Sequence, residues 1–280
     1  MALSQIVRPI MRVWTSESSP VALRTKQLVA AVLPDSVLLQ LKTRYYIKLL
    51  RNDSDERMEV DARALPLLVR PGDFVIDVGA FVGFYTQRLS RLVGPGGAVW
   101  SFEPMPQTHK ILSAAVRSLG LANVRLFPHA LSDASRATQM EIPRYSGGGE
   151  SFWDAKIVDG GGDAQAFRRF EITTRTLDSL TAGTDRPLTF IKIDAEYHEL
   201  QVIRGALETF RRWHPVLQVE TLEPVDDPGT DFHTMLQLLA GLGYRPYRFD
   251  GSGFHLRHPG EREQNVFFLT VDRAAELGAR

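Results

Sequence analysis

Hydrophobic and polar positions follow one period near the start of the chain and another beyond residue 70. Up to about residue 65, apolar residues recur at spacings of three or four, which predicts helices. These residues are Leu28, Val29, Val32, Val37, Leu38, Leu41, Tyr45 and Leu49. We therefore expect a helical N-terminal extension over residues 1–65. Basic side chains among them form either a solvated face or a lip over an anionic substrate or a membrane surface. They are Arg44, Lys48 and Arg51.

After Pro71, short apolar runs alternate with helical stretches. Strands are expected at residues 74–78, 99–102, 124–127, 188–193 and 215–219, with a terminal hairpin of 244–249 and 265–270. Helices are expected at 84–93, 106–119, 200–210 and 233–242. Strands that are apolar throughout indicate a parallel sheet covered on both faces. The predicted fold class is α/β, with a Rossmann-like sheet of about seven mostly parallel strands and an antiparallel last strand.

Residues 135–176 interrupt this alternation. Residues 138–142 and 169–174 have the composition of two antiparallel strands, and glycine triplets at 147–149 and 160–162 lie between them. A long insertion in a compact domain is usually either a functional loop or a disordered one. We expect an inserted hairpin that acts as a lid or substrate wall, within one domain spanning residues 66–280.

Composition excludes several classes of function. Apolar residues make up 44% of the chain and charged residues 24%, which is typical of a globular protein and not of a disordered one. Lys and Arg number 33, as do Asp and Glu, so no overall charge favours nucleic acid or an anionic membrane. The absence of cysteine removes thiol catalysis, iron–sulfur clusters and disulfides.

The chain has no predicted segment that would take it into a membrane. No apolar stretch reaches the ~20 residues that cross a bilayer. Arg8 and Arg12 interrupt the apolar start, so we read no signal peptide there. We expect a cytoplasmic protein with a small-molecule partner, and the sequence leaves its oligomeric state open.

The first candidate site follows the strand predicted at 74–78. Asp77 lies at the carboxyl end of that strand, where it could accept a hydrogen bond from an ammonium group or a water molecule. Gly79 permits a tight turn, and Gly83 permits close approach of the next helix. The start of that helix offers unpaired N–H groups to an anion such as a carboxylate. This order of residues is typical of a nucleotide-binding loop.

Glu103 closes the second strand, 20 residues after Gly83. An acid at this place suits a bidentate contact with ribose hydroxyls. The dinucleotide fingerprint requires three glycines, whereas this loop has Gly79 and Gly83 with Ala80 and Phe81 after the first. The residues therefore favour S-adenosylmethionine (SAM), which joins an adenosine to an amino acid. The alternative is that the glycines only aid packing and Glu103 is solvated.

A second group of acids follows the strand predicted at 188–193: Asp194, Glu196 and Glu199. Acids at a helix start stabilise it by ~0.3–1 kcal/mol each through its partial positive charge. Because these acids lie beside the expected cofactor cleft, we interpret Asp194 and Glu196 as active-site residues. His198 is a candidate general base, since the intrinsic pKa of histidine suits that role. A histidine near the start of a helix is, however, more often structural or exposed.

Glu220 ends the next strand and should project toward the same crevice as Asp194. Two carboxylates there could hold Mg²⁺ or orient a substrate hydroxyl. Alternatively, Glu220 pairs with an arginine. The sequence does not distinguish these arrangements.

Several segments, in their order along the chain, resemble the FkbM-type SAM-dependent methyltransferases, which are class I methyltransferases. They are VIDVGAFVGFYT, VWSFEPMP, the step from Ala130 to Asp133, TRTLDSL, FIKIDAEYHELQVIRGA and VLQVE. The resemblance extends from about Pro71 to Glu220, a little over half of the chain.

The resemblance implies a seven-stranded sheet with a reversed last strand and the cofactor over the first strands. The cofactor-binding positions that it implies are Asp77, Gly79, Ala80, Phe81, Gly83, Glu103, Pro104, Ser132 and Asp133. Among these, Glu103 would hold the ribose, and Ser132 and Asp133 would lie near the adenine. The candidate catalytic residues are Asp194, Glu196, His198 and Glu220.

Members of this family typically methylate hydroxyl groups, often on sugars or natural products. The resemblance therefore implies O-methylation of such a small molecule, with Asp194 or Glu196 as proton acceptor or hydroxyl orienter. Two alternatives stay open. One is a nicotinamide-dependent oxidoreductase, which shares the sheet and the ribose acid, and the other is a non-catalytic binding module. RNA methylation is disfavoured by the zero net charge.

Two positions depart from the family pattern. The cofactor loop usually has Asn where this chain has Phe81, and the acidic motif usually reads Asp-x-Glu-Gly, with Gly where this chain has Tyr197. Phe81 could face the sulfonium through a cation–π contact. Tyr197 adds bulk where the substrate pocket is expected.

Overall fold

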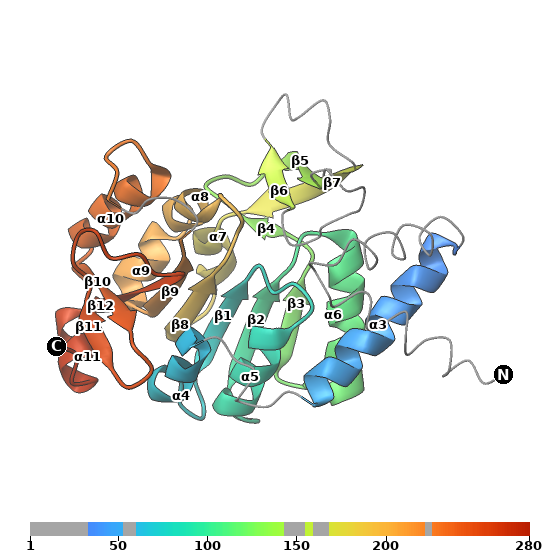
Figure 1. Ribbon diagram of the computed structural model, residues 1–280, viewed down its shortest axis with the longest axis horizontal. Helices are drawn as coiled ribbons and strands as arrows, with labels where there is room; N and C mark the ends of the chain where they lie inside the picture. Colours follow the sequence, from blue (N-terminus) through green and yellow to red (C-terminus); the bar gives the residue numbers. More distant parts are fainter. Residues whose placement is uncertain (1–32, 53–59, 143–154, 159–167, 222–225) are drawn as a thin grey trace.

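The computed structural model describes residues 33–52, 60–142, 155–158, 168–221 and 226–280. In these residues, one large mixed β-sheet carries helices on both faces, and a smaller sheet lies at one end of its strands (Figure 1). The architecture is the predicted Rossmann-like α/β fold.

The first part of the large sheet follows the predicted alternation of strands and helices. Its elements are β1 (Phe74–Val78), α5 (Phe84–Val93), β2 (Ala98–Phe102), α6 (Pro106–Leu119) and β3 (Val124–Phe127). Pro106 suits the first turn of α6 because its fixed φ is helical, and Gly120 ends that helix in a left-handed conformation. The predicted bounds of these elements agree with the structure to within one residue.

The second part of the sheet adds an element that the sequence analysis did not expect. The elements are β8 (Leu188–Ile193), α8 (Glu199–Arg204), α9 (Leu207–Trp213), β9 (Val216–Glu220), α10 (Asp231–Gly241), β10 (Tyr244–Phe249), β11 (Phe254–Leu256), β12 (Asn265–Thr270) and α11 (Val271–Glu276). The strand β11 makes the sheet eight-stranded instead of seven-stranded. It is a three-residue edge strand paired with β10, too short to give a pattern in the sequence.

The strand order places a ligand-binding crevice at the centre of the large sheet. The order is β11-β10-β12-β9-β8-β1-β2-β3. The adjacent strands β9, β8, β1, β2 and β3 are parallel to one another. The strand β12 lies between β9 and β10 and is antiparallel to both. The predicted antiparallel last strand is thus confirmed. The strands after β1 are added first on one side of it (β2, β3) and later on its other side (β8, β9), so the strand order switches between β1 and β8. Ligands of open α/β sheets bind beyond the carboxyl ends of the strands at such a switch point.

The smaller sheet is built largely from the predicted insertion. Its strands, in spatial order, are β4 (Ala130–Leu131), β7 (Arg168–Arg175), β5 (Ala137–Ile142) and β6 (Lys156–Val158). β5 and β7 pair antiparallel, as the sequence predicts for residues 138–142 and 169–174. Both glycine triplets lie outside the described residues. After β7, the short helix α7 (Leu177–Thr181) leads back to the large sheet.

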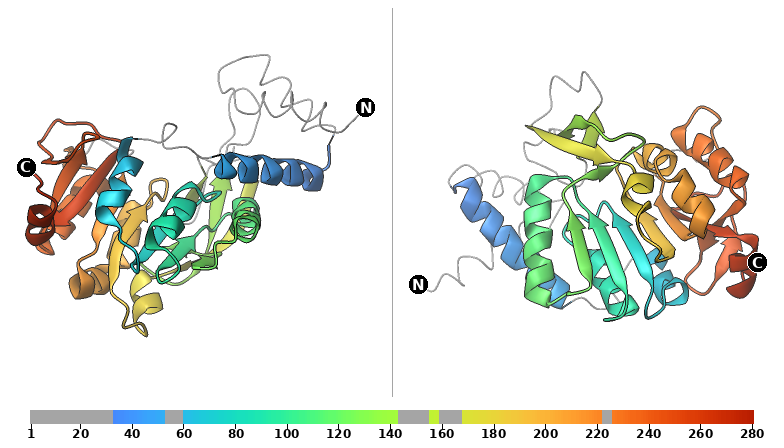
Figure 2. Two further views of the ribbon diagram at one scale, coloured as in Figure 1. Left: turned by 90° about the horizontal axis from the view of Figure 1, so that it is seen from below. Right: turned by 180° about the vertical axis from the view of Figure 1, so that it is seen from behind.

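Successive residues of β1 pack on opposite helical layers (Figure 2). Ile76 and Val78 belong to a core shared with α8, α9 and α10. Val75 belongs to a second core with α5, the 3₁₀ helix η2 (Val60–Ala64) and α4 (Leu65–Leu68). Both faces of the sheet are therefore buried under other elements, which is why the sequences of its strands are continuous apolar runs.

Near the start of the described chain, α3 (Asp35–Arg51) packs along α6. Arg51 donates a hydrogen bond to the Ser118 hydroxyl of α6 over 2.8 Å. The helix contains five of the predicted apolar positions, whereas Leu28, Val29 and Val32 lie outside the described residues. The division of the chain at residue 65 stays a prediction. Of the helices that the structure describes, none combines the length and hydropathy that crossing a bilayer requires.

Candidate functional site

The strand register brings together residues from four segments at the carboxyl ends of β2, β1, β8 and β9. One row of cross-strand neighbours is formed by Ser101, Asp77, Lys192 and Gln218. Two residues farther along the same segments come Glu103, Gly79, Asp194 and Glu220. Parallel pairing therefore places the predicted cofactor residues and the predicted acids at one edge of the sheet.

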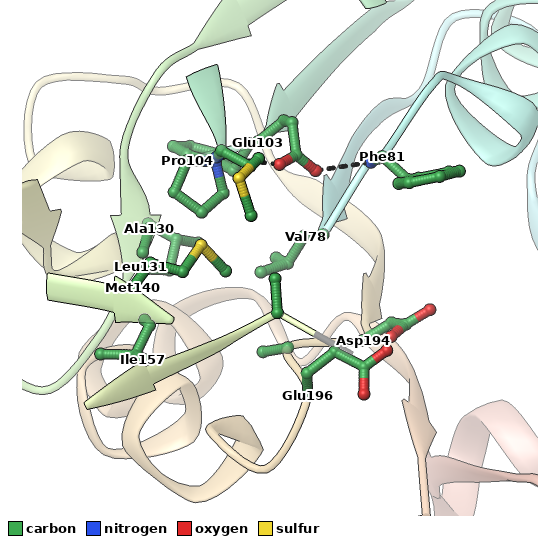
Figure 3. Close-up of a pocket in the computed structure, with 15 residues that line it drawn as sticks. Val78, Phe81, Glu103, Pro104, Ala130, Leu131, Met140, Ile157, Asp194 and Glu196 are labelled. Carbon is green, nitrogen blue, oxygen red and sulfur yellow. Dashed lines mark hydrogen bonds between the residues drawn. The ribbon is translucent and has the colours of Figure 1, made fainter. Parts of the chain in front are cut away.

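A pocket lies at this edge (Figure 3). It encloses about 680 Å³, a volume that includes its open mouth. The predicted site residues that line it are Gly79, Phe81, Glu103, Pro104, Asp194 and Glu196. The predicted residues that are not part of its lining are Asp77, Ala80, Gly83, Ser132, Asp133, His198 and Glu220.

Gly79 is where the turns after β1 and β8 approach each other. Its φ is +73°, and a Cβ added to it would lie 1.8 Å from the backbone carbonyl oxygen of Asp194. The amides of Gly79 and Ala80 both donate to the Phe102 carbonyl oxygen over 3.0 Å, which fixes the loop to β2. Gly83, with a φ of +106°, then caps α5. Only glycine fits at position 79, because both the backbone conformation and the space exclude a side chain.

Glu103 is buried, and its carboxylate accepts three strong hydrogen bonds. Oε1 accepts from the Met105 amide over 2.9 Å and from the Thr108 hydroxyl over 2.7 Å, and Oε2 accepts from the Phe81 amide over 2.7 Å. Burial raises the pKa of Glu103 to about 7, although all three donors oppose the rise. A carboxylate has about four lone-pair sites. These contacts therefore fix its orientation and leave room for one more donor.

The ring of Phe81 lies away from the centre of the pocket (Figure 3). It makes an edge-to-face contact with Tyr46 of α3, with 5.9 Å between the ring centroids. The part of Phe81 that interacts with Glu103 is the backbone amide. The cation–π contact between Phe81 and a sulfonium stays a prediction.

Asp77 lies beneath the pocket and not in its wall. Its side chain is fully buried, and Oδ2 accepts a hydrogen bond from the Thr86 hydroxyl of α5 over 2.6 Å. Burial raises the pKa of Asp77, and the ammonium of Lys192 and the Thr86 hydroxyl act against that rise. Asp77 thus anchors the end of β1 to α5, and a direct contact with cofactor stays a prediction.

Asp194, Glu196 and Glu220 form an acidic cluster at the other end of the pocket. One carboxylate oxygen of each lies within 4.8 Å of the other two. Burial, followed by the charges of Asp194 and Glu196, raises the pKa of Glu220 to about 9, so Glu220 is protonated at neutral pH. The arginine partner considered for Glu220 is not found among the described residues, where Lys192 is the cation that acts on it.

Lys192 is a site residue that the sequence analysis missed. Its side chain is 6% exposed, its ammonium donates to Asp194 Oδ2 over 2.7 Å, and it lies 4.6 Å from the ring centroid of Tyr85. Burial by itself lowers the pKa of Lys192, but Asp194, Asp77 and Tyr85 together raise it above its usual value. The available signal was a single charged residue in a strand of otherwise uncharged residues, because an unpaired charge is not buried in a sheet.

Two consecutive residues after β8 adopt left-handed conformations. Glu196 has a φ of +49° and Tyr197 a φ of +68°, which costs an L-residue ~1–2 kcal/mol each. Glu199 fastens the turn, since its Oε1 accepts a hydrogen bond from the Ala195 amide over 2.8 Å. The turn directs Glu196 into the pocket lining and leaves the Tyr197 side chain 60% exposed. Strained turns of this kind persist where the surroundings hold them and are concentrated at functional sites.

His198 and Ser132 contact each other and not the pocket. His198 is buried, and its Nε2 lies 2.9 Å from Ser132 Oγ. Asp133 accepts a hydrogen bond from Arg136 over 3.1 Å. A catalytic role for His198 and a cofactor contact for Ser132 and Asp133 stay predictions, but this geometry makes His198 a link between β4 and α8.

The smaller sheet forms one wall of the pocket. Met140 of β5 and Ile157 of β6 line it, and they belong to a hydrophobic cluster with Met105 and Ala130. The described part of the insertion is thus a wall, in the place where the sequence suggested a lid or substrate wall. The individual residues were missed because apolar side chains in a strand carry no chemical signature.

The chain matches the model of a known protein family. Residues 77–246 match the model of the methyltransferase FkbM domain, which is more than half of the chain. The chain belongs to the FkbM methyltransferase family. The family implies SAM as the cofactor, and it agrees with the resemblance carried by the sequence motifs. Among curated proteins, none matches the chain significantly.

Solved methyltransferase structures have a distant likeness to this chain. The FkbM methyltransferase from Methylobacillus flagellatus is 16% identical with a TM-score of 0.45, over 86% of this chain and 57% of its own. The O-methyltransferase from Bacillus cereus, solved in complex with S-adenosylhomocysteine (SAH), is 16% identical with a TM-score of 0.47, over 86% of this chain and 94% of its own. The present chain covers only a little over half the length of the Methylobacillus flagellatus protein.

The first prediction concerns the contact at Gly79. We expect Gly79→Ala to lower the free energy of unfolding by ~2–5 kcal/mol, since left-handed strain costs ~1–2 and overpacking ~1–3. The matched control is Gly72→Ala, because Gly72 has a φ of +91° but no atom within 4 Å of an added Cβ. Gly72→Ala should lower the free energy of unfolding only by the cost of the left-handed conformation, ~1–2 kcal/mol. Urea unfolding of both variants measures the difference, and equal losses would contradict the steric constraint at Gly79.

The second prediction concerns the strained turn. We expect Tyr197→Gly to raise the free energy of unfolding by ~0.5–1 kcal/mol, because the relief of left-handed strain exceeds the added entropy of the unfolded chain. Leu67→Gly removes another exposed apolar side chain from a helical position and should instead destabilise the protein by ~1 kcal/mol. Thermal unfolding measures both changes. A loss of stability in Tyr197→Gly would show that the turn is not strained.

Proposed function

We propose that this protein is a SAM-dependent methyltransferase that methylates a hydroxyl group of a sugar-like or natural-product-like small molecule. The observation that carries the proposal is one pocket with Glu103 at one end and Asp194 and Glu196 at the other. Membership of the FkbM family supports the cofactor and the class of reaction. The hydroxyl acceptor is inferred from the acids, and its sugar-like or natural-product-like character from the family resemblance.

The pocket's residues fit the parts of SAM in chemical type. Glu103 is an oriented carboxylate with one unused lone pair, which can accept a hydrogen bond from one ribose hydroxyl. Met105, Ala130 and Met140 give an apolar surface suited to an adenine ring. Because Glu220 is protonated, two acids, Asp194 and Glu196, face the single ammonium of Lys192 at the far end, and this arrangement suits a positively charged sulfonium.

The protein's own contribution is orientation and the removal of one proton. When bound, SAM supplies a methyl group on a positively charged sulfur, which a nucleophilic oxygen can take. Lys192 donates to Oδ2 of Asp194 and holds that side chain in place, and the Asp194 carboxylate would accept the hydroxyl proton. Glu196 would orient the same hydroxyl from its side of the cluster. Protonated Glu220 is a hydrogen-bond donor and not a base at neutral pH.

Mg²⁺ is a second candidate occupant of the acidic cluster. Oxygen ligands from Asp194, Glu196 and Glu220 lie close enough to share one ion, and Mg²⁺ prefers oxygen ligands. The Lys192 ammonium on Asp194 and the proton on Glu220 already offset part of the negative charge, so the cluster does not require a metal ion for charge balance. Turnover measured with and without EDTA decides between these occupants.

Binding and turnover together test the proposed function. We expect calorimetry to detect SAH binding to the wild-type protein and no comparable binding of NAD⁺. Turnover is followed as SAH released from SAM with a panel of methyl glycosides and phenolic natural products. Asp194→Asn keeps an oxygen for Lys192 but loses the charge. It should retain SAH affinity within about threefold and lose turnover by at least ~100-fold, the usual worth of a general base.

Asp185→Ala is the matched control, because Asp185 is fully exposed at the surface and pairs with Arg212. It should leave both quantities unchanged. Tight NAD⁺ binding without SAH binding would instead favour an oxidoreductase, and binding of neither would favour a non-catalytic module. Full turnover in Asp194→Asn would remove the proposed role of Asp194.

A further prediction follows from the pKa of Glu103. The pKa of about 7 means that Glu103 is mostly protonated at pH 6 and mostly ionised at pH 8. Ribose hydroxyls donate more strongly to the ionised form, so SAH affinity should rise by up to about tenfold from pH 6 to pH 8. Glu103→Gln should bind SAH more weakly and lose this pH dependence. An unchanged pH profile in Glu103→Gln would show that another group titrates.

A further inference from the structure

The helix α3 contacts the cofactor loop through one aromatic side chain. The ring of Tyr46 lies edge-on to Phe81, with a centroid distance of 5.9 Å and an interplanar angle of 82°. It also lies edge-on to Phe84, at 6.4 Å and 80°. Phe81 belongs to the loop after β1, and Phe84 is the first residue of α5. Tyr46 thus touches the loop and the helix that follows it.

Phe81 has a backbone conformation that its residue type does not favour. Its φ is +48°, in the left-handed region that bulky residues avoid. In this conformation its amide donates to Glu103 Oε2 over 2.7 Å. A contact from outside the loop can add to the hydrogen bonds that hold this conformation, and aromatic pairs in edge-to-face geometry supply such stabilisation. The Tyr46 ring is positioned to do so.

Other contacts hold α3 in place independently of Tyr46. Leu50 is fully buried, and its carbonyl oxygen accepts a hydrogen bond from Gln87 Nε2 of α5 over 3.1 Å. Arg51 bonds to Ser118 of α6. A substitution at Tyr46 can therefore alter the loop without removing the helix from the domain.

We infer that Tyr46 is a positioning residue of the cofactor site: it holds Phe81 in the conformation that fixes Glu103, and so couples the docking of α3 to cofactor binding. The inference rests on the proposed function, because Glu103 acts on the cofactor only if SAM binds in this pocket. Coupling between two binding events is reciprocal. Bound cofactor therefore strengthens the docking of α3, just as docked α3 strengthens cofactor binding.

The test compares SAH affinity in the full chain, by calorimetry, between variants of α3. Tyr46→Ala is expected to weaken SAH binding by about tenfold, the effect of losing two aromatic pairs. Tyr46→Phe retains the ring and is expected to stay within twofold of wild type. Arg51→Ala removes the exposed hydrogen bond to Ser118, whereas the buried Leu50 and the Tyr46 ring still hold α3 in place, so it should also stay within twofold. A general loosening of α3 would instead weaken binding in Arg51→Ala as well.

A double-mutant cycle separates positioning from stability. Asn adopts the left-handed conformation more readily than Phe. In a Phe81→Asn background, Tyr46→Ala should therefore weaken SAH binding clearly less than in the wild-type background. A purely structural Tyr46 would lower the thermal stability equally in both backgrounds and leave SAH affinity unchanged. That result would overturn the inference.

Hydrogen exchange tests the reverse direction of the coupling. Saturating SAH should slow amide exchange in residues 44–51 of the wild-type protein, and this protection should be lost in Tyr46→Ala. Unchanged exchange in these residues on SAH binding would overturn the inference while leaving the proposed function intact. Failure of the wild-type protein to bind SAH at all would reject the proposed function itself, so the two failures are distinguishable.

Discussion

The backbone contact between Gly79 and Asp194 is the constraint on which the site depends. Gly79 turns the chain after β1, Asp194 turns it after β8, and a Cβ on Gly79 would lie 1.8 Å from the Asp194 carbonyl oxygen. Because the two turns meet backbone to backbone, the cofactor loop and the acidic turn cannot move independently. The distance between a ligand over Gly79 and the carboxylate of Asp194 is therefore set by the fold itself, and alignment of reacting groups is where such a site gains most of its rate.

Buried electrostatics reinforce this steric constraint. Lys192 lies in the strand row beneath the site, where its ammonium is bonded to Asp194 and attracted to Asp77. Buried charges are tolerated only when they are paired, so one lysine satisfies acids from two neighbouring strands. On Glu220, burial and the other acids outweigh the same ammonium, and that side chain takes up a proton. The cluster thereby contains an acid bonded to the lysine and a protonated acid that can donate a hydrogen bond.

The sequence predicted the parts of this arrangement that depend on local pattern or on strand ends. The bounds of β1, α5 and β3 follow from their apolar runs, and Asp194 was placed near Glu103 because the carboxyl ends of parallel strands share one edge of the sheet. Contacts between distant segments left no such pattern. Lys192 lies within a strand, Tyr46 lies next to the predicted apolar stripe of a helix and not in it, and Met140 lies in an insertion with no motif.

The two departures from the family pattern show what those positions require. Phe81 and Tyr197 both have left-handed backbones, with φ of +48° and +68°, and the family pattern places Asn and Gly there, the residue types that adopt this conformation most readily. This chain therefore holds left-handed conformations with residue types that adopt them less readily. It compensates from outside each turn, through Tyr46 beside Phe81 and through Glu199 beside the acidic turn. A strained backbone is expected where amides and side chains are needed at fixed positions. Here the strained residues lie in the loop after β1 and in the turn that carries the acidic cluster.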